Sequence, residues 1–374
     1  MTTKVVTTRA NGSDDFSRCI SQQKKDGGRD PACEMQFFAW RPAPSFSFTC
    51  WLFVLIWRFN LTTVFAPPKI ETSTQAGLEN HVGNTPLIPL RRVTRHLPPR
   101  VQVLAKAEWF NPGGSVKDRP ALNILRTALA NGELAPGKRL LDSTSGNMGI
   151  AYATFGAALG IPVTQTIPAN ASPERLAILR ALGAEVILTD PSEGSDGATR
   201  LARQMAAEQP EHYFYANQYD NPANWQAHYL ATGPEIVAQT GGQITHFVAG
   251  LGTSGTLTGV GLYLREINPA IQLIGVQPDG PLHGLEGLKH MQTAIRPGIY
   301  DPKFPDRVVA VATEEAHAML RRLAREEGLF VGISSGAAAV AAMKVASELE
   351  EGMVVTLFPD AGYKYLSDQA LWEG

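Results

Sequence analysis

From about Gly77 to the C-terminus, short apolar runs that suit β-strands alternate with segments that suit helices. Runs such as VQVLAKAEW, IPVTQTIP and LFVGISSG read as strands, whereas RPALNILRTALANGEL and SPERLAILRALG read as helices. Ser172 and Pro173 are typical of a helix start, and Gly160 of a helix end. This alternation predicts an α/β fold with parallel sheets covered by helices, in which ligands bind beyond the carboxyl ends of strands.

Length, charge and cysteine content narrow the possible functions. A chain of 374 residues favours two domains over one compact core. A formal net charge of −2 argues against a nucleic-acid partner, because no excess of basic residues is present to displace phosphate counterions. Cys19, Cys33 and Cys50 all precede residue 51. The main body therefore has no disulfide, no cysteine-ligated metal and no thiol nucleophile, so any covalent chemistry uses another group.

Residues 1–75 differ in composition from the rest of the chain. They contain an apolar run at 46–57, which is short for a spanning helix of roughly twenty residues unless it continues to Ala66. We expect residues 1–75 to be a disordered extension, or upstream translation from a wrongly assigned start. Membrane association through residues 46–66 is the alternative that we disfavour. Residues 76–374 form the expected folded body.

Three glycine-rich turns in this body each lie between a strand and a helix. GLGTSGTLTG, from Gly250, offers backbone N–H groups and a helix start that suit a phosphate, or it is a plain packing turn. It lacks the lysine of a Walker A loop. STSGNMG, from Ser143, suits a carboxylate or an ordinary helix cap. GISSGAA, from Gly332, places a serine either at a cap or in a site.

Lys117 helps to decide whether these turns bind a ligand or are ordinary packing and capping turns. It follows Gly113-Gly114-Ser115 in NPGGSVKDRPALNIL and precedes an apolar helical run. A salt bridge with Asp118 is the ordinary explanation for such a lysine. A desolvated lysine instead has a lowered pKa and can form a Schiff base. Together with a phosphate cup and a carboxylate site, this lysine suits pyridoxal phosphate, whose ring takes up electrons from an amino acid's Cα.

Six motifs in order extend this reading to a family. GNTPLIPL, NPGGSVKDRPA, TSGNMGIAYA, NPANWQAHYLATGPEI, GLGTSGTLTGVG and GISSGAA resemble those of the cysteine synthase family, over about Gly77 to Gly374. The resemblance implies the tryptophan synthase β-like fold of pyridoxal phosphate enzymes (fold type II). Two intertwined parallel-sheet α/β domains would hold the cofactor between them, the smaller spanning roughly residues 120–225. It also implies a cytoplasmic homodimer.

The resemblance assigns roles position by position. The cofactor would be bound covalently by Lys117, with Asn147 at its ring hydroxyl and Ser334 at its pyridine nitrogen. The phosphate cradle would consist of Gly252, Thr253, Ser254, Gly255 and Thr256. The substrate α-carboxylate would meet Thr144, Ser145, Gly146 and Gln218. Met148 departs from the family pattern, because threonine is usual there.

The implied reaction is β-replacement on O-acetylserine or O-phosphoserine, through an aminoacrylate intermediate, to give L-cysteine. Lys117 would act as the general base. The sulfur donor would be sulfide, thiosulfate or a carrier-protein thiocarboxylate. The segment from Asp279 to Pro302 and the run DAGYKYLSD resemble the cysteine synthase B type, which includes users of O-phosphoserine. Lys289 would then meet the substrate phosphate, or else it is a solvated loop charge.

Other functions remain open at this point. Within the same fold they are serine or threonine dehydratase, threonine synthase and cystathionine β-synthase, although the run from Ser115 to Arg119 fits the synthases better than the dehydratases. From other classes they are a nucleotide- or NAD-binding α/β module and a cofactor-free interaction protein.

Overall fold

The computed structural model describes residues 77–144 and 146–373, and every structural statement below concerns these residues. Contacts within the chain group Ser73–Gly374 into one compact unit. The expected N-terminal extension, with its apolar segments 46–57 and 46–66, lies outside the described residues. Among the described residues, none of the helices has the length and apolar character that crossing a bilayer requires.

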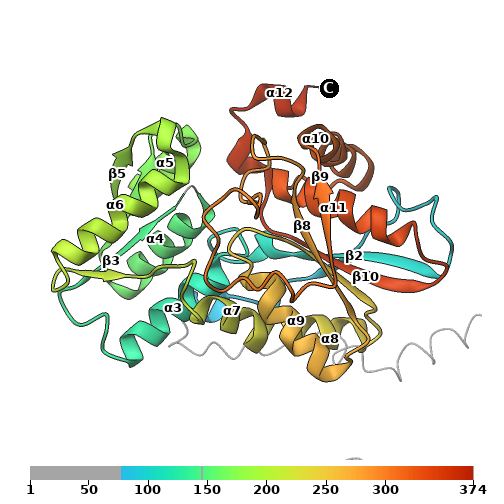
Figure 1. The fold of residues 1–374 in the computed structure, drawn as a ribbon, viewed down its shortest axis with the longest axis horizontal. Coiled ribbons are helices and arrows are strands. Elements are labelled where there is room, and N and C mark those ends of the chain that lie inside the picture. Colours follow the sequence, from blue (N-terminus) through green and yellow to red (C-terminus); the bar gives the residue numbers. More distant parts are fainter. Residues whose placement is uncertain (1–76, 145, 374) are drawn as a thin grey trace, which may run out of the picture. The chain divides into compact units, whose positions relative to one another are not determined.

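The larger of two sheets has six strands in the order β1-β2-β10-β7-β8-β9 (Figure 1). They are β1 (Leu87–Pro89), β2 (Val101–Ala107), β7 (His246–Gly250), β8 (Gln272–Pro278), β9 (Arg307–Val311) and β10 (Gly352–Phe358). Strand β1 is antiparallel to β2, and the other pairings are parallel. Ala107 at the end of β2 pairs with Phe358 at the end of β10. The segments that follow these two strands therefore leave the sheet side by side.

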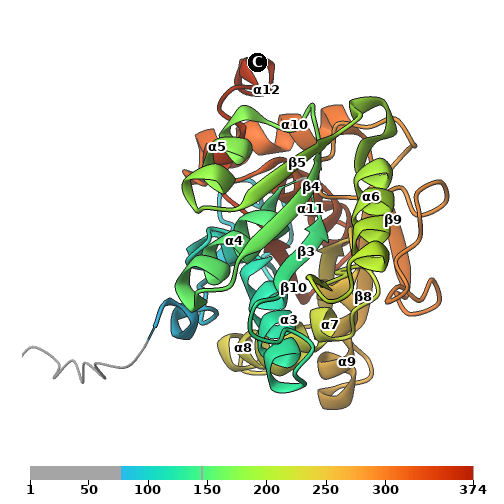
Figure 2. The same cartoon turned by 90° about the vertical axis from the view of Figure 1, so that its left-hand side faces the viewer.

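The smaller sheet has four parallel strands in the order β5-β4-β3-β6. They are β3 (Arg139–Ser143), β4 (Val163–Pro168), β5 (Glu185–Thr189) and β6 (Tyr213–Tyr215). Helices α4 (Asn147–Leu159) and α6 (Gly194–Glu208) lie on opposite sides of β3 and β4 (Figure 2). All six residues of β4 are buried, as expected for a strand covered on both faces. The predicted α/β class with parallel sheets is confirmed.

The remaining helices connect or cover these strands. They are α3 (Asp118–Ala130), α5 (Pro173–Ala181), α7 (Ala223–Ala227), α8 (Gly233–Thr240), α9 (Gly255–Ile267), α10 (Thr313–Arg322), α11 (Ile333–Ala346) and α12 (Gln369–Trp372). Two expected boundaries are confirmed. The hydroxyl of Ser172 accepts a hydrogen bond from the N–H of Arg175 at the start of α5, and Gly160 ends α4 in the left-handed conformation.

The expected strand in LFVGISSG is wrong. Its backbone forms a single bridge between Val331 and Ala361, and α11 already begins at Ile333. The apolar character of this run has another cause. Nearly all of α11 is buried in the core of the six-stranded sheet, and its many alanines allow close packing there. A short apolar run bounded by glycine reads equally well as a strand or as the entry to a buried helix.

A buried cluster of charges ties α3 to the larger sheet and to α8. The Arg119 guanidinium donates to Glu108 Oε2 at 2.6 Å and to Glu235 Oε1 at 2.7 Å. Lys106 donates to Glu235 Oε2, also at 2.6 Å. Burial disfavours the ionised form of Glu235, but its bonds with Arg119 and Lys106 outweigh burial and lower its pKa to about 2. Because α3 begins directly after Lys117, this cluster also holds that lysine in place.

We predict that Arg119→Met destabilises the protein by about 3–5 kcal/mol, because the substitution leaves the buried Glu108 carboxylate without its main partner. Urea unfolding of the wild type and of each variant measures the free energy of unfolding. Arg307→Met is the matched control, since Arg307 pairs with Glu348 on the surface, where loss of an ion pair costs about 1 kcal/mol or less. Equal losses in the two variants would contradict a stabilising role for the buried cluster.

Candidate active site

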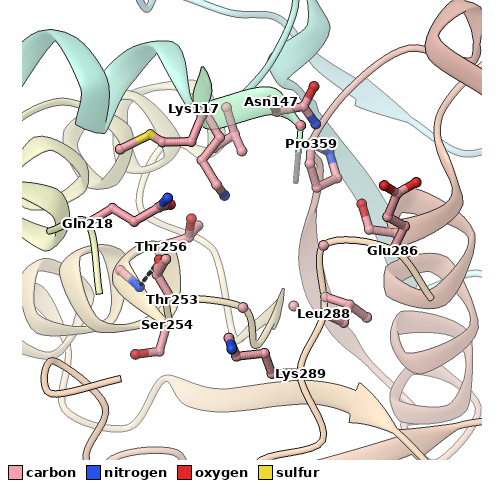
Figure 3. Close-up of a pocket in the computed structure, with 18 of the residues that line it drawn as sticks. Lys117, Asn147, Gln218, Thr253, Ser254, Thr256, Glu286, Leu288, Lys289 and Pro359 are labelled. Carbon is pink, nitrogen blue, oxygen red and sulfur yellow. Dashed lines mark hydrogen bonds between the residues drawn. The ribbon is translucent and has the colours of Figure 1, made fainter. Parts of the chain in front are cut away.

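A pocket lies at the carboxyl ends of strands from both sheets, and Figure 3 shows side chains that line it. Every described residue that the sequence assigned to cofactor or substrate is part of its wall: Lys117, Thr144, Gly146, Asn147, Gln218, Gly252, Thr253, Ser254, Gly255, Thr256, Lys289 and Ser334. Ser145 lies outside the described residues. The fold thus brings together side chains that are spread over more than half of the chain.

Lys117 lies directly before α3, and its amine faces the pocket (Figure 3). The turn before it is held firmly. Gly114 has a φ of 75°, which favours glycine, and the N–H of Val116 donates to the carbonyl of Pro359 at 2.8 Å. Burial lowers the pKa of Lys117, and the Asp360 carboxylate acts in the opposite direction. An amine in such surroundings loses its proton more easily than a solvated lysine and becomes a nucleophile toward aldehydes.

The ordinary explanation for Lys117, a salt bridge with Asp118, is not what the structure shows. The Asp118 carboxylate instead accepts a hydrogen bond from the N–H of Gly113. Burial raises the pKa of Asp118 to about 7, although that hydrogen bond opposes the shift. Within residues 77–144 and 146–373, the Lys117 amine has no hydrogen-bond or ion-pair partner. No direct contact within those residues therefore stabilises its charged form.

The turn between β7 and α9 forms a backbone cradle. Ser254 has a φ of 68°, and Gly255 begins α9. Within the described part of the chain, the N–H groups of Gly252, Thr253 and Ser254 have no protein acceptor. Thr253 and Thr256 line the pocket, whereas the side chain of Ser254 points away from Lys117 (Figure 3). Free N–H groups at a helix start attract an anion, so this cradle fits a phosphate.

The glycines of this turn are required by close packing. A Cβ on Gly252 would lie 2.4 Å from the carbonyl oxygen of Gly287, and a Cβ on Gly255 would lie 2.0 Å from Asn224 Oδ1. Asn224 in turn donates to Thr253 Oγ1 at 3.2 Å. A side chain at Gly252 would displace backbone, and one at Gly255 would displace the Asn224 side chain that bonds to Thr253.

The start of α4 forms the opposite wall of the pocket. The hydroxyl of Thr144 accepts hydrogen bonds from the N–H groups of Gly146 and Gly149, each at 3.1 Å. The hydroxyl predicted to meet a substrate carboxylate thus also caps the helix. The Asn147 amide donates to Asp360 Oδ2 at 2.8 Å and accepts from Lys364 Nζ at 2.7 Å. This side chain is held from both ends.

Gln218 and Ser334 complete the set of neutral polar groups. The Gln218 side chain donates to the carbonyl of Ser143 at 2.9 Å, which fixes it against the loop after β3. Ser334, in the first turn of α11, lines the pocket, whereas the next residue, Ser335, is fully buried and not part of the wall. Of the two serines in GISSGAA, Ser334 is therefore the one placed to meet a ligand.

Two cationic side chains, Lys289 and Arg175, also line the pocket. The Lys289 amine is 4.9 Å from the centre of the Tyr219 ring, and burial lowers its pKa while Asp196 opposes the shift. Arg175 was missed by the sequence analysis. Its guanidinium forms an ion pair with Glu286 and lies 5.0 Å from the centre of the Tyr365 ring.

A sequence signal for Arg175 did exist. The residue occupies the first turn of α5, where the helix dipole disfavours a positive charge, so a specific partner elsewhere was to be expected. Asp360 and Lys364 were also missed as individual residues. Both lie within six residues of the end of the buried strand β10, at the edge where ligands bind in parallel sheets.

These groups together fit pyridoxal phosphate. An unpaired buried amine suits its aldehyde, free backbone N–H groups suit its phosphate, and neutral polar side chains suit its ring. A nucleotide-binding module or a cofactor-free protein would have no use for an unpaired amine at this position.

Comparison with known proteins agrees with this fit. Residues 78–360 match the model of the family described as pyridoxal-phosphate dependent enzyme. The chain is 53% identical over 291 residues to a cysteine synthase of Aquifex aeolicus, covering 76% of this chain and 89% of that protein. It is 45% identical over 289 residues to cysteine synthase B of Pseudomonas aeruginosa, covering 76% and 94%.

A solved structure is also similar. The crystal structure of a cysteine synthase from Entamoeba histolytica matches with a TM-score of 0.76 and 37% identity, over 79% of this chain and 90% of that one. The fold type II architecture expected from the sequence motifs is thereby confirmed, as is pyridoxal phosphate as the cofactor. The chain belongs to the family of pyridoxal-phosphate dependent enzymes.

Proposed function

We propose that this protein is a cysteine synthase, which replaces the β-substituent of an O-activated L-serine with sulfur to give L-cysteine. The observation that carries the proposal is the buried Lys117 amine, which faces a phosphate cradle and a helix start in one pocket. The cysteine synthases that this chain resembles over most of its length support the choice of reaction. O-acetylserine and O-phosphoserine are the candidate substrates.

The cofactor would be held at four points. Lys117 would bind its aldehyde, the Gly252–Thr256 turn its phosphate, Asn147 its ring hydroxyl and Ser334 its ring nitrogen. When bound, pyridoxal phosphate supplies an electron sink for the bonds at the substrate's Cα. A neutral serine hydroxyl does not keep the ring nitrogen protonated, which moderates that sink and suits loss of a β-substituent.

The substrate would be oriented by the opposite wall. The N–H groups at the start of α4, with Thr144, Gly146 and Gln218, would bind the α-carboxylate. Ser145 belongs to the same proposed set. A carboxylate bound there would fix the orientation of the amino acid in the pocket.

Lys117 would then act as the proton carrier. Once its amine is free, it takes the proton from Cα, and it returns that proton to Cα after sulfur has bonded to the β-carbon. Its burial favours the neutral amine that this role requires.

Partners and location follow from the resemblance to known families. We propose a homodimer that acts in the cytoplasm, with an amino-acid substrate. Sulfide is the simplest sulfur donor, and thiosulfate or the thiocarboxylate of a sulfur-carrier protein are the alternatives.

We predict that Lys117→Ala lowers kcat by about a thousandfold or more, since both the covalent anchor and the general base are lost. The purified variant should also lack the visible absorption band that borohydride removes from the wild type. Lys303→Ala, which changes an exposed lysine, is the control and should retain both properties. Retained turnover with an unchanged band in the Lys117 variant would end the proposal.

We predict that the protein freed of cofactor captures pyridoxal phosphate with a pH midpoint below about 10.4, the ordinary lysine value. The neutral amine is the reactive form, and burial lowers its pKa. Asp360→Asn should move the midpoint lower still, because the Asp360 carboxylate favours the charged amine. Trapping with borohydride across a pH series measures both values. A midpoint that rises in the variant would show that Asp360 does not act on Lys117 in this way.

We predict that Lys289→Ala lowers kcat/KM for O-phosphoserine by about 10- to 100-fold, the usual effect of losing one hydrogen bond to a charged group. Turnover of O-acetylserine should change by less than about threefold, because its leaving group carries no charge. Lys289→Arg should keep most of the activity with O-phosphoserine. If Lys289→Ala leaves the ratio of the two substrates unaltered, Lys289 is a loop charge without a role in recognition.

A further inference from the structure

Lys364 is a buried lysine that the proposed reaction does not use. It lies in the short 3₁₀-helix Gly362–Tyr365 after β10, and only 8% of its surface is exposed. Burial lowers its pKa, while Asp360 and Asp118 oppose the shift. No carboxylate lies within salt-bridge distance of its amine in the described part of the chain. A cation buried without an ion-pair partner costs stability, so its place calls for a reason.

Its amine donates to three neutral acceptors. They are Asn147 Oδ1 at 2.7 Å, the Gly114 carbonyl at 3.1 Å and the Gly113 carbonyl at 3.4 Å. A lysine ammonium has three protons, so all of them are engaged. Two acceptors belong to the turn that precedes Lys117, and the third belongs to the side chain proposed to meet the cofactor ring.

The contacts of Asn147 fix which way its amide faces. Lys364 occupies the amide oxygen, and Asp360 Oδ2 accepts one of the two amide protons at 2.8 Å. One N–H proton is left for a ligand. In Figure 3 the amide nitrogen of Asn147 lies on the side of Pro359, and its oxygen points the other way. If the amide were reversed, its nitrogen would meet the Lys364 ammonium, which cannot accept a hydrogen bond.

The Lys364 ammonium also places a positive charge at the amide oxygen, which offsets the negative charge of the Asp360 carboxylate at the amide nitrogen. A positive charge favours the ionised form of a nearby acidic hydroxyl, and a hydrogen bond donated to that oxygen does the same. Both effects would act on the ring hydroxyl oxygen of pyridoxal phosphate, which Asn147 would contact.

We propose that Lys364 is a positioning residue that directs the Asn147 N–H toward the ring hydroxyl oxygen of pyridoxal phosphate and holds that oxygen ionised. The proposal rests on the proposed function, which places the cofactor on Lys117. Through its bonds to Gly113 and Gly114, Lys364 fixes the turn that carries Lys117 in the same network.

The test uses the holoenzyme and Lys364→Met, which keeps the chain length and removes the charge and the donors. The ring hydroxyl should become harder to ionise, so its pKa should rise. As the pH is lowered, the visible band of the ionised form should therefore be replaced by the near-ultraviolet band at a higher pH than in the wild type. The dissociation constant for pyridoxal phosphate should rise about tenfold, the loss expected for one hydrogen bond with a charged donor. Lys364→Arg should restore both properties to within about threefold of the wild type.

A double-mutant cycle separates positioning from plain structural support. If Lys364 acts through Asn147, the Lys364→Met substitution should have little further effect on the band in an Asn147→Ala background. Additive effects would overturn the proposal, as would a Lys364→Met variant with altered melting temperature but an unchanged band and affinity. Lys303→Met, at an exposed lysine, is the control for introducing methionine.

A second variant covers the case of misfolding, and the wild-type spectrum tests the proposed function separately. Should Lys364→Met fail to fold, Lys364→Gln retains donors without the charge, and its band should shift in the same direction; an unshifted band would overturn the proposal. Failure of the proposed function has a different signature, because the wild-type protein would then show no band sensitive to borohydride.

Discussion

Partial removal of the Lys117 amine from water is the constraint on which the rest of the site depends. Strands β2 and β10 end side by side, and the two segments that follow them are joined where the N–H of Val116 donates to the carbonyl of Pro359. The turn before Lys117 bonds to Pro359, and the cluster around Arg119 secures the helix after it. An amine held in this way has a lowered pKa, and it is therefore ready to act first as a nucleophile and later as a base.

In the described part of the chain, some buried cations are paired with carboxylates and others are not. Arg119 and Lys106 are paired with carboxylates, and these pairs stabilise the junction between helices and sheet. Lys117 has no direct partner there, and Lys364 has only neutral ones. Unpaired charges reduce stability, whereas the paired cluster next to Lys117 anchors α3 to the larger sheet and to α8. A stable frame thus supports a reactive centre, as is common where function and stability compete.

The sequence predicted much of this arrangement and missed some of it, for identifiable reasons. Most of the strand–helix alternation and the turns from Ser143 and Gly250 were read correctly because both depend on neighbouring residues. LFVGISSG was misread, since a short apolar run does not reveal whether a strand or a buried helix follows. Arg175 and Lys364 were missed because their roles depend on contacts with Glu286 and Asn147, which lie far away along the chain.

The amino-acid sequence by itself determined the class of fold, the family motifs and the identity of the reactive lysine. Hydrophobic periodicity, helix caps and short motifs each depend on residues that are close together in the sequence. Only the tertiary structure decided how these residues meet. Lys364 reaches the carbonyl of Gly114, 250 positions away, solely because β10 lies parallel to β2 in register. The pairing of distant strands is set by packing of the whole core, and the electrostatic surroundings of each charge follow from that packing.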